Sequence, residues 1–282
     1  MEPQTTRSRV ATVSLHDGIE MPQLGFGVFQ VPPTDTQEAV ELALEAGYRH
    51  FDTAASYGNE RGVGAALAAS ALPREDYFVT TKLWNSHQGH DPTLAAFEAS
   101  LERLGLDHVD LYLIHWPVPA RGLYVDTWRA FERIHGEEAA RTIGVSNFRI
   151  EDLEVLEWET ETRPTVNQIE LHPGFQQAEL RAWHAERGIA TEAWSPLAQG
   201  ELLADATVAR MAENHGATPA QVILRWHLQL GNVVIPKSVT PARIRENIEV
   251  FDFSLSDREM DEIEALDSGE RIGPDPATFV TP

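Results

Sequence analysis

The side chains of this sequence best suited to chemistry are a tyrosine, a lysine, an aspartate and a histidine: Tyr57, Lys82, Asp52 and His115. Lysine itself is scarce, because Lys82 and Lys237 are the only lysines among 22 Lys and Arg residues. Lysine is a compact point charge whose pKa can be adjusted, whereas arginine is a planar cation that stays charged. We therefore expect both lysines to lie where arginine would substitute poorly.

The four side chains together suit proton transfer through a phenol. Free tyrosine has a pKa of about 10, which is too high for efficient proton exchange at neutral pH. Lowering that pKa towards 7 requires roughly 4 kcal/mol of preferential stabilisation of the phenolate. A Lys82 ammonium held by Asp52 is predicted to supply much of it to Tyr57. His115 is then free to hydrogen-bond and orient a carbonyl oxygen.

Secondary structure must bring these residues together, and the chain alternates short β-rich runs with helical stretches. The expected strands are residues 21–27, 48–52, 77–82, 109–115, 141–145, 165–170, 189–194 and 233–236. The expected helices, with apolar residues three and four apart, are 36–46, 61–71, 92–104, 124–135, 150–157, 177–187, 204–214, 219–230 and 241–250. Gly47, Gly105 and Gly188 follow three of the helices, as helix-ending glycines do.

About eight strand–helix units in 282 residues match the size of a (β/α)8 TIM barrel, so we expect one barrel domain over residues 1–282. Residues 13–15 and 19–21, joined at Asp17-Gly18, predict an N-terminal β-hairpin that closes the N-terminal end of the barrel. The pair 204–214 and 219–230 is an extra helical segment before the last strand. An open Rossmann-type sheet is the alternative, but its only candidate glycine motif, around Gly62 and Gly64, is partial.

In a barrel of this kind, the active site lies at the C-terminal ends of the strands. The predicted strand ends carry polar or aromatic residues at nearly every position, and both lysines are among them: Asp52, Lys82, His115, Ser146, Asn147, Gln168, Trp194, Ser195, Lys237 and Ser238. Taken singly, each has an ordinary structural explanation; Ser146 and Asn147, for example, suit a helix N-cap. Their joint placement on consecutive strand ends favours one shared site.

Several segments, in this order, resemble the aldo-keto reductase family, and most closely its bacterial branch of 2,5-diketo-D-gluconate reductases. They are GYRHFDTAASYGNERGVGAAL (47–67), TKLWN (81–85), DLYLIHWP (110–117), IGVSNF (143–148), VNQIELHP (166–173) and IPKSVTPARIRENIEVFDFSLS (235–256). The resemblance runs from near the first barrel strand almost to the C-terminus. It implies a monomeric NADPH-dependent oxidoreductase that reduces small carbonyl compounds.

The resemblance also implies roles for individual residues. Tyr57 becomes the catalytic acid/base, tuned by Lys82 and Asp52, and His115 orients the carbonyl. The implied substrate-binding residues are Phe29, Trp84, His115 and Trp116. Nicotinamide is expected to stack on Trp194, with its carboxamide held by Ser146, Asn147 and Gln168. The rest of the implied cofactor site is Ser195, Pro196, Leu197, Gln199, Gly200, Lys237, Ser238, Val239, Thr240, Arg243, Glu246 and Asn247.

The segment around Lys237 is what favours NADPH over NADH. It matches the family's site for the adenosine 2′-phosphate, at a strand end where a helix begins at Thr240-Pro241. A helix N-terminus with flanking cations is suited to an anion. Lys237 can meet a phosphate oxygen as a point charge, and Arg243 can clamp the phosphate or stack on adenine. The alternative is that the arginines of this helix are ordinary surface residues.

The overall composition narrows the possible partners. A formal net charge of −22 disfavours nucleic acid and anionic membranes. There is no cysteine, and the N-terminus lacks the apolar core of a signal peptide, so a cytoplasmic location is expected. No membrane span is predicted. No metal site is predicted either, because His87 and His90 have no third ligand in view.

The sequence thus predicts NADPH-dependent reduction of small aldehydes, dicarbonyls or sugar-derived ketones. Members of the aldo-keto reductase family that act on steroids carry a longer C-terminal loop over the pocket, so the resemblance and the short tail (RIGPDPATFVTP) together imply a shallow, open substrate site. Two alternatives are a non-catalytic cofactor-binding relative and a Schiff-base lyase that uses Lys82 as nucleophile. The lyase needs a neutral lysine, whereas an Asp52 partner would keep Lys82 protonated.

Overall fold

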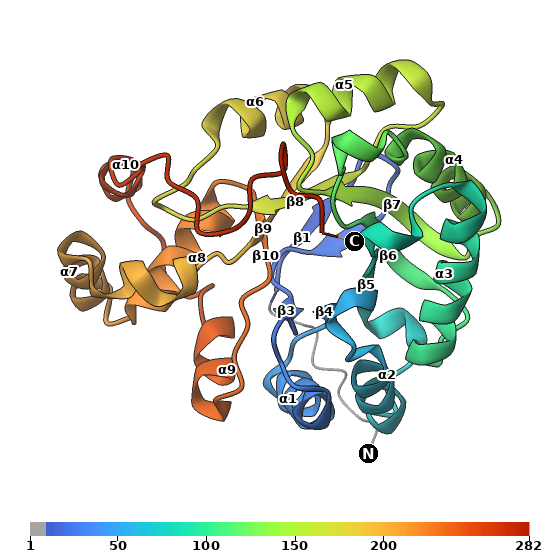
Figure 1. Ribbon diagram of the computed structural model, residues 1–282. Helices are drawn as coiled ribbons and strands as arrows, with labels where there is room; N and C mark the ends of the chain where they lie inside the picture. The colour runs from blue at the N-terminus through green and yellow to red at the C-terminus, as the bar shows by residue number, and fades with distance from the viewer. Residues whose placement is uncertain (1–9, 282) are drawn as a thin grey trace.

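The computed structural model describes residues 10–281, and its centre is a closed barrel of eight parallel strands that neighbour one another in chain order (Figure 1). The strands are β3 (Phe26–Gly27), β4 (His50–Asp52), β5 (Phe78–Leu83), β6 (Val109–Ile114), β7 (Ala140–Ser146), β8 (Val166–Glu170), β9 (Ala190–Trp194) and β10 (Val233–Val234). Leu24 and Val234 form a parallel bridge between the two edges. Gly25 N donates to Val234 O at 2.8 Å, which completes the closure.

Helices surround the barrel and alternate with its strands. They are α1 (Pro33–Ala46), α2 (Glu60–Ala69), α3 (His90–Leu104), α4 (Tyr124–Gly136), α5 (Ile150–Glu159), α6 (Ala178–Arg187), α7 (Ala206–His215), α8 (Pro219–Gln229), α9 (Pro241–Ile248) and α10 (Asp257–Glu264). Both α7 and α8 lie between β9 and β10, which confirms the extra helical segment. The predicted barrel fold is therefore confirmed.

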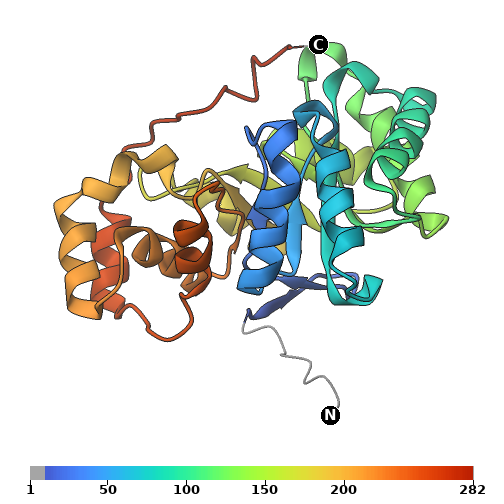
Figure 2. The ribbon, with the colours of Figure 1, turned by 90° about the horizontal axis from the view of Figure 1, so that it is seen from below.

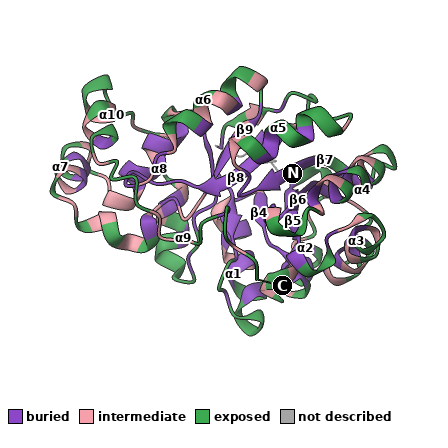
Figure 3. Ribbon diagram, turned by 45° about the horizontal axis from the view of Figure 1, so that its top comes forward, coloured by how far each residue is buried: buried purple, intermediate pink, exposed green. Residues whose placement is uncertain are grey.

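The strands are buried on both faces, as parallel strands covered by helices are (Figure 3). Side chains of a strand alternate between its two faces, so every second residue points into the barrel. On β4 these are His50 and Asp52, and on β5 they include Lys82. This alternation carries the predicted strand-end residues into one interior space.

The N-terminal hairpin covers the end of the barrel where the strands begin. Strands β1 (Thr12–Ser14) and β2 (Glu20–Pro22) pair antiparallel, close to the predicted boundaries. Leu15 and Met21 cluster with buried side chains at the starts of the barrel strands, including Phe78 and Val166. Figure 2 shows the hairpin and the C-terminal tail at opposite ends of the molecule. The ends of the strands, where the predicted site residues lie, are therefore at the end of the barrel opposite the hairpin.

Several element boundaries differ from the sequence expectation. The first strand was expected at 21–27, but β3 contains only Phe26 and Gly27, because Met21 belongs to the hairpin and Leu24 joins β10 through a single bridge. The last strand ends before Pro236, which has no N–H for a sheet ladder. Helix α10 was missed, although Ser256 and Glu259 form a capping box at its start.

Candidate active site

Lys82 is the centre of a hydrogen-bonded group at the C-terminal end of the barrel. Its Nζ donates to Asp52 Oδ1 at 2.6 Å, to the Thr53 carbonyl at 3.0 Å and to the Tyr57 hydroxyl at 3.4 Å. Lys82 is completely buried at the end of β5, Asp52 ends β4, and Tyr57 ends a short 3-10 turn that follows β4. The structure thus brings together three of the four predicted catalytic side chains.

The charge of Lys82 is maintained by its neighbours. Burial alone would lower the pKa of its ammonium, but the negative charge and hydrogen bond of Asp52, together with the smaller effects of Tyr57 and Glu192, outweigh burial and leave the pKa raised. Lys82 is therefore protonated at neutral pH and unsuited to Schiff-base formation, which needs a neutral amine.

The acidity of Tyr57 differs from the sequence expectation. Burial raises the pKa of its phenol, and the opposing effect of Lys82 is not enough to reverse the shift. Lys82 acts in the predicted direction, but the predicted net lowering was wrong for the protein alone. The phenol is therefore fully protonated at neutral pH, which is the form required of a proton donor.

His115 follows β6 and lies beside Tyr57. The two rings are 5.6 Å apart between centroids in an edge-on arrangement, and Ser56 Oγ is 3.4 Å from His115 Nδ1. Burial, together with the positive charge of Lys82, holds the pKa of His115 well below its usual value. The imidazole is therefore neutral at neutral pH and has one N–H with which to donate a hydrogen bond.

The predicted substrate-binding aromatics surround this group. The Phe29 ring lies 5.1 Å from the Tyr57 ring and is about half exposed, at 51%. The Trp84 ring lies 5.2 Å from the His115 ring. Trp116 is buried under Phe279 of the C-terminal tail, with ring centroids 4.3 Å apart. The tail, although short, thus covers part of the rim that we expected to be open.

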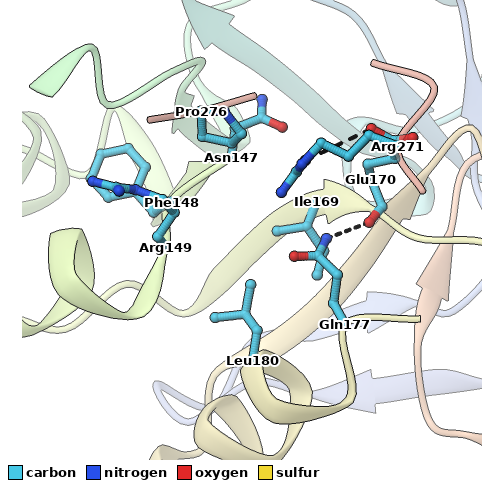
Figure 4. Close-up of a pocket in the computed structure, with 9 residues that line it drawn as sticks. All are labelled: Asn147, Phe148, Arg149, Ile169, Glu170, Gln177, Leu180, Arg271 and Pro276. Atoms are coloured by element: carbon cyan, nitrogen blue, oxygen red, sulfur yellow. Dashed lines mark hydrogen bonds and ion pairs between the residues drawn. The ribbon is translucent and has the colours of Figure 1, made fainter. Parts of the chain in front are cut away.

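Glu170, at the end of β8, attaches this tail to the barrel. Its carboxylate accepts hydrogen bonds from the backbone N–H groups of Ile272 at 2.6 Å and Gly273 at 3.0 Å. Arg271 lies 3.8 Å from the same carboxylate, and Gln177 Nε2 donates to the Glu170 carbonyl (Figure 4). Figure 1 shows the tail crossing from α10 over β8 towards β6. Sequence reasoning missed Glu170, although it follows Gln168 on the same face of β8.

The predicted nicotinamide-binding residues lie on the next strands round the barrel. Ser146 and Asn147 follow each other at the end of β7, and both are buried. Asn147 Nδ2 donates to the His115 carbonyl at 2.9 Å, and Trp194 Nε1 donates to Asn147 Oδ1 at 2.8 Å. Gln168 Nε2 donates to Asp52 Oδ2 at 2.8 Å. The hydrogen bonds therefore connect the proposed cofactor side directly to the proton-donating group.

The loop after β9 has an unusual backbone. Ser195, Ala198 and Gln199 have φ values of 49°, 49° and 52°, in the left-handed region, and Gly200 has a φ of 98°. Such conformations are uncommon for residues other than glycine and are often found at functional sites. The loop contains the predicted cofactor residues Ser195, Pro196, Leu197, Gln199 and Gly200.

The second predicted cofactor segment joins β10 to α9. Lys237, Val239, Thr240 and Arg243 are exposed, while Ser238 is buried and its Oγ accepts from Thr240 N at 3.1 Å. Among residues 10–281, Lys237 and Arg243 form no ion pair, so both charges are available to a ligand. Asn247 is buried on α9, whereas Glu246 accepts from Thr218 Oγ1 at 2.8 Å and so links α9 to the N-cap residue of α8. A phosphate group fits this exposed, positively charged helix start.

Within residues 10–281, no cluster of three or more His, Asp or Glu side chains could hold a metal ion. The same residues include no helix long and apolar enough to cross a membrane. Besides Glu170, sequence reasoning missed three contributors to the site: Thr53, Ser56 and Phe279. Thr53 acts through its backbone carbonyl, which no residue type could have indicated.

Comparison with known proteins agrees with this geometry. The profile of the Aldo/keto reductase family matches residues 23–268. This chain belongs to the aldo/keto reductase family. An aldo-keto reductase of Mycobacterium sp. (strain KMS) is 60% identical over 95% of this chain and 97% of the relative. A methylglyoxal reductase, DkgA, of Yersinia pestis is 54% identical over 95% of this chain and 96% of its own length.

Solved structures of the family share the fold. A Gox0644 variant in complex with NADPH superimposes with a TM-score of 0.93 at 48% identity, covering 96% of this chain and 99% of the other. The predicted family, the barrel fold and an oxidoreductase that acts on carbonyl groups are thereby confirmed.

Proposed function

We propose that this protein uses NADPH to reduce small aldehydes and dicarbonyls, with methylglyoxal as a representative substrate, and that Tyr57 is the proton donor. The observation that carries the proposal is the position of Lys82 Nζ, within hydrogen-bonding distance of both Asp52 and the Tyr57 hydroxyl. A buried ammonium at this position stabilises the phenolate that Tyr57 becomes when it gives up its proton.

The residues of the site can carry out the proton transfer that accompanies reduction of the carbonyl group. His115 donates a hydrogen bond to the carbonyl oxygen and holds it next to the Tyr57 hydroxyl. As negative charge develops on that oxygen, Tyr57 transfers its proton to it, which gives the alcohol. Fixed donors aimed at a developing oxyanion are among the strongest contributions to catalysis. Lys82 compensates the charge left on Tyr57, and Asp52 keeps Lys82 in place.

Bound NADPH supplies the hydride that reduces the carbonyl carbon. The chain offers a matching set of groups: the partly exposed Trp194 ring for the nicotinamide, and amide or hydroxyl groups of Ser146, Asn147 and Gln168 for its carboxamide. Lys237 and Arg243, without ion-pair partners among residues 10–281, are proposed to hold the 2′-phosphate. The NADPH complex of a 48% identical relative supports this choice of cofactor.

The substrate class is inferred from the rim and from the relatives. Phe29, Trp84 and Trp116 form an aromatic edge around Tyr57 and His115, and Phe279 narrows it further. Such an edge suits a small carbonyl compound better than a bulky one. The 54% identical Yersinia pestis relative bears the name methylglyoxal reductase, which supports a dicarbonyl.

The test is NADPH oxidation in the presence of methylglyoxal, followed by the absorbance of NADPH. The Tyr57→Phe variant should lose turnover by at least about 100-fold, because it lacks only the proton-donating hydroxyl. Its affinity for NADPH, measured by protein fluorescence, should change little. Substantial turnover by Tyr57→Phe would disprove the role of Tyr57, and a wild-type protein that binds NADPH without turnover would favour the non-catalytic alternative.

A further inference from the structure

Glu192 on β9 is a fully buried carboxyl group with no part in the proton transfer described above. It lies on the same face of its strand as Trp194, two residues further on. Gln168 Nε2 donates to Glu192 Oε2 at 2.9 Å and to Asp52 Oδ2 at 2.8 Å. A single amide group therefore bridges Glu192 and the aspartate that holds Lys82.

We propose that Glu192 is a positioning residue for the reduction, whose protonation state, acting across Gln168, leaves the negative charge on Asp52 against Lys82 and so adjusts the acidity of Tyr57. The inference rests on the proposed function, since it concerns the same proton donor. Glu192 is not itself a catalytic residue, because the reacting group that it influences lies beyond Gln168, Asp52 and Lys82.

The hydrogen bonding of Glu192 favours its neutral, protonated form. Oε2 accepts one hydrogen bond, whereas Oε1 has no hydrogen-bond partner within residues 10–281 and lies 3.8 Å from His50 Nε2. A buried carboxylate needs partners on both oxygens to offset its lost hydration, so a single donor is too few. Asp52, in contrast, receives Lys82 on one oxygen and Gln168 on the other. The proton therefore belongs on Glu192 and the negative charge on Asp52.

The charged groups around Glu192 agree with this assignment. Burial raises the pKa of Glu192 to about 8, and the negative charge of Asp52 adds to the shift, while Gln168 and Lys82 oppose it. His50 on β4 adds no positive charge, because burial lowers its pKa to about 3. The flanking strands β8 and β10 contribute only the neutral Gln168 and Val233 opposite Glu192. Burial raises the pKa of Asp52 as well, but the charge of Lys82 and the hydrogen bonds from Lys82 and Gln168 oppose that shift. Because Asp52 has a donor on each oxygen, we assign the negative charge at neutral pH to Asp52, facing the Lys82 ammonium.

The two hydrogen bonds that Gln168 donates to Asp52 and Glu192 also limit how its side chain can bind a cofactor. Both N–H groups of its side-chain amide point at carboxyl oxygens, so only its carbonyl oxygen remains. Gln168 can then accept a hydrogen bond from a nicotinamide carboxamide but cannot donate one to it.

The decisive variant is Glu192→Gln, which preserves the shape and an acceptor for Gln168 but can never ionise. In the wild type, Glu192 becomes negative above about pH 8, and that charge raises the pKa of both Tyr57 and Lys82. Without it, Tyr57 loses its proton more readily. The alkaline decline of kcat for reduction should therefore move to lower pH by at least ~0.5 unit.

The matched control is Glu60→Gln. Glu60 is equally buried, but it accepts from Thr81 and Arg103 and does not contact the group around Lys82. Its pH profile should coincide with that of the wild type. The proposal is overturned if the Glu192→Gln profile also coincides with the wild type, or if both variants shift equally.

A second measurement needs neither turnover nor a variant. Infrared spectra of wild-type protein labelled with carbon-13 glutamate should show a protonated glutamic acid band at pH 7 that disappears as the pH rises through about 8. Absence of that band at pH 7 would disprove the neutral Glu192 even if Glu192→Gln failed to fold. If the band is present but no carbonyl compound is reduced, the proposed function fails and the charge state of Glu192 stands.

Discussion

At the scale of single residues, the proposed proton donor depends on a few buried contacts, because Lys82 Nζ donates to both Asp52 and the Tyr57 hydroxyl. Asp52, Lys82 and His115 were placed correctly because strand ends follow from β-rich runs and because a barrel brings all its strand ends together. The net pKa of Tyr57 could not be predicted, since it depends on how many atoms exclude water from the ring. Glu192 was overlooked because its burial also depends on the folded structure. A glutamate within a strand usually faces solvent, and only closure of the barrel buries this one.

Lys82 provides the residue-scale prediction. Lys82→Arg should lower kcat by about 100-fold or more, although the charge is kept, because a planar guanidinium cannot reproduce three contacts from one point in a fully buried site. The measurement is steady-state reduction of methylglyoxal alongside NADPH affinity. Arg210→Lys, an exposed cation on α7, is the control for a simple exchange of the two residue types and should retain wild-type kcat. Near-normal kcat in Lys82→Arg would contradict the argument.

At the scale of elements, α9 begins at Pro241, as predicted from the sequence, and follows the loop that carries Lys237. The motif places Arg243 three residues inside the helix start, where it is exposed and free of ion pairs within residues 10–281. Arg243→Ala should raise KM for NADPH by about 10-fold or more and leave KM for NADH nearly unchanged, because only NADPH carries the 2′-phosphate. Arg245→Ala, exposed on the same helix, is the matched control. Equal increases in KM for NADPH and for NADH would show that Arg243 does not bind the 2′-phosphate.

The C-terminal tail is the element that the sequence did not predict. Residues 268–281 have no helical or strand periodicity, and their path depends on contacts with residues about a hundred positions earlier, such as Glu170 with Ile272. Phe279 could not be assigned to the substrate rim without those contacts. Helix α10 was a different case, because Ser256 and Glu259 carried a usable capping signal that was overlooked.

A substitution at Gly273 tests whether the tail shapes the site. A Cβ at this position would lie 2.3 Å from Trp194 Cη2 and 2.9 Å from Glu170 Oε2, so the tail must move to admit it. Gly273→Ala should therefore raise KM for methylglyoxal several-fold, with little loss of thermal stability, since the barrel strands are not involved. Gly136→Ala, where a Cβ meets nothing within 4 Å, is the control. An unchanged KM for methylglyoxal in Gly273→Ala would show that the position of the tail does not affect substrate binding.

At the scale of the whole molecule, one barrel holds an unusual number of neutral histidines. Burial lowers the pKa of His50, His184 and His227 to about 3, and that of His115 well below its usual value. Each has a folded-state pKa below its unfolded value of about 6.5. Their contribution to stability is therefore complete above pH 6.5 and is lost as the pH falls from 6.5 towards 3. Glu192 acts in the opposite sense, with a folded pKa of about 8 against about 4.5 unfolded, so it favours the fold as the pH falls from 8 to 4.5.

Asp52, whose pKa burial also raises, acts in the same sense as Glu192. Four histidines against these two carboxyl groups give a net loss of stability on acidification. The free energy of unfolding, measured with urea, should fall between pH 6.5 and 4.5, and each buried histidine should add ~1.4 kcal/mol per pH unit to the slope. His184 is the best residue to remove, because it packs between α6 and the barrel, against Asn167 and Thr191, away from Lys82. His184→Gln should reduce the slope by the contribution of one proton. A slope equal to that of the wild type in His184→Gln would mean that acid unfolding is governed by the carboxylates and not by the buried histidines.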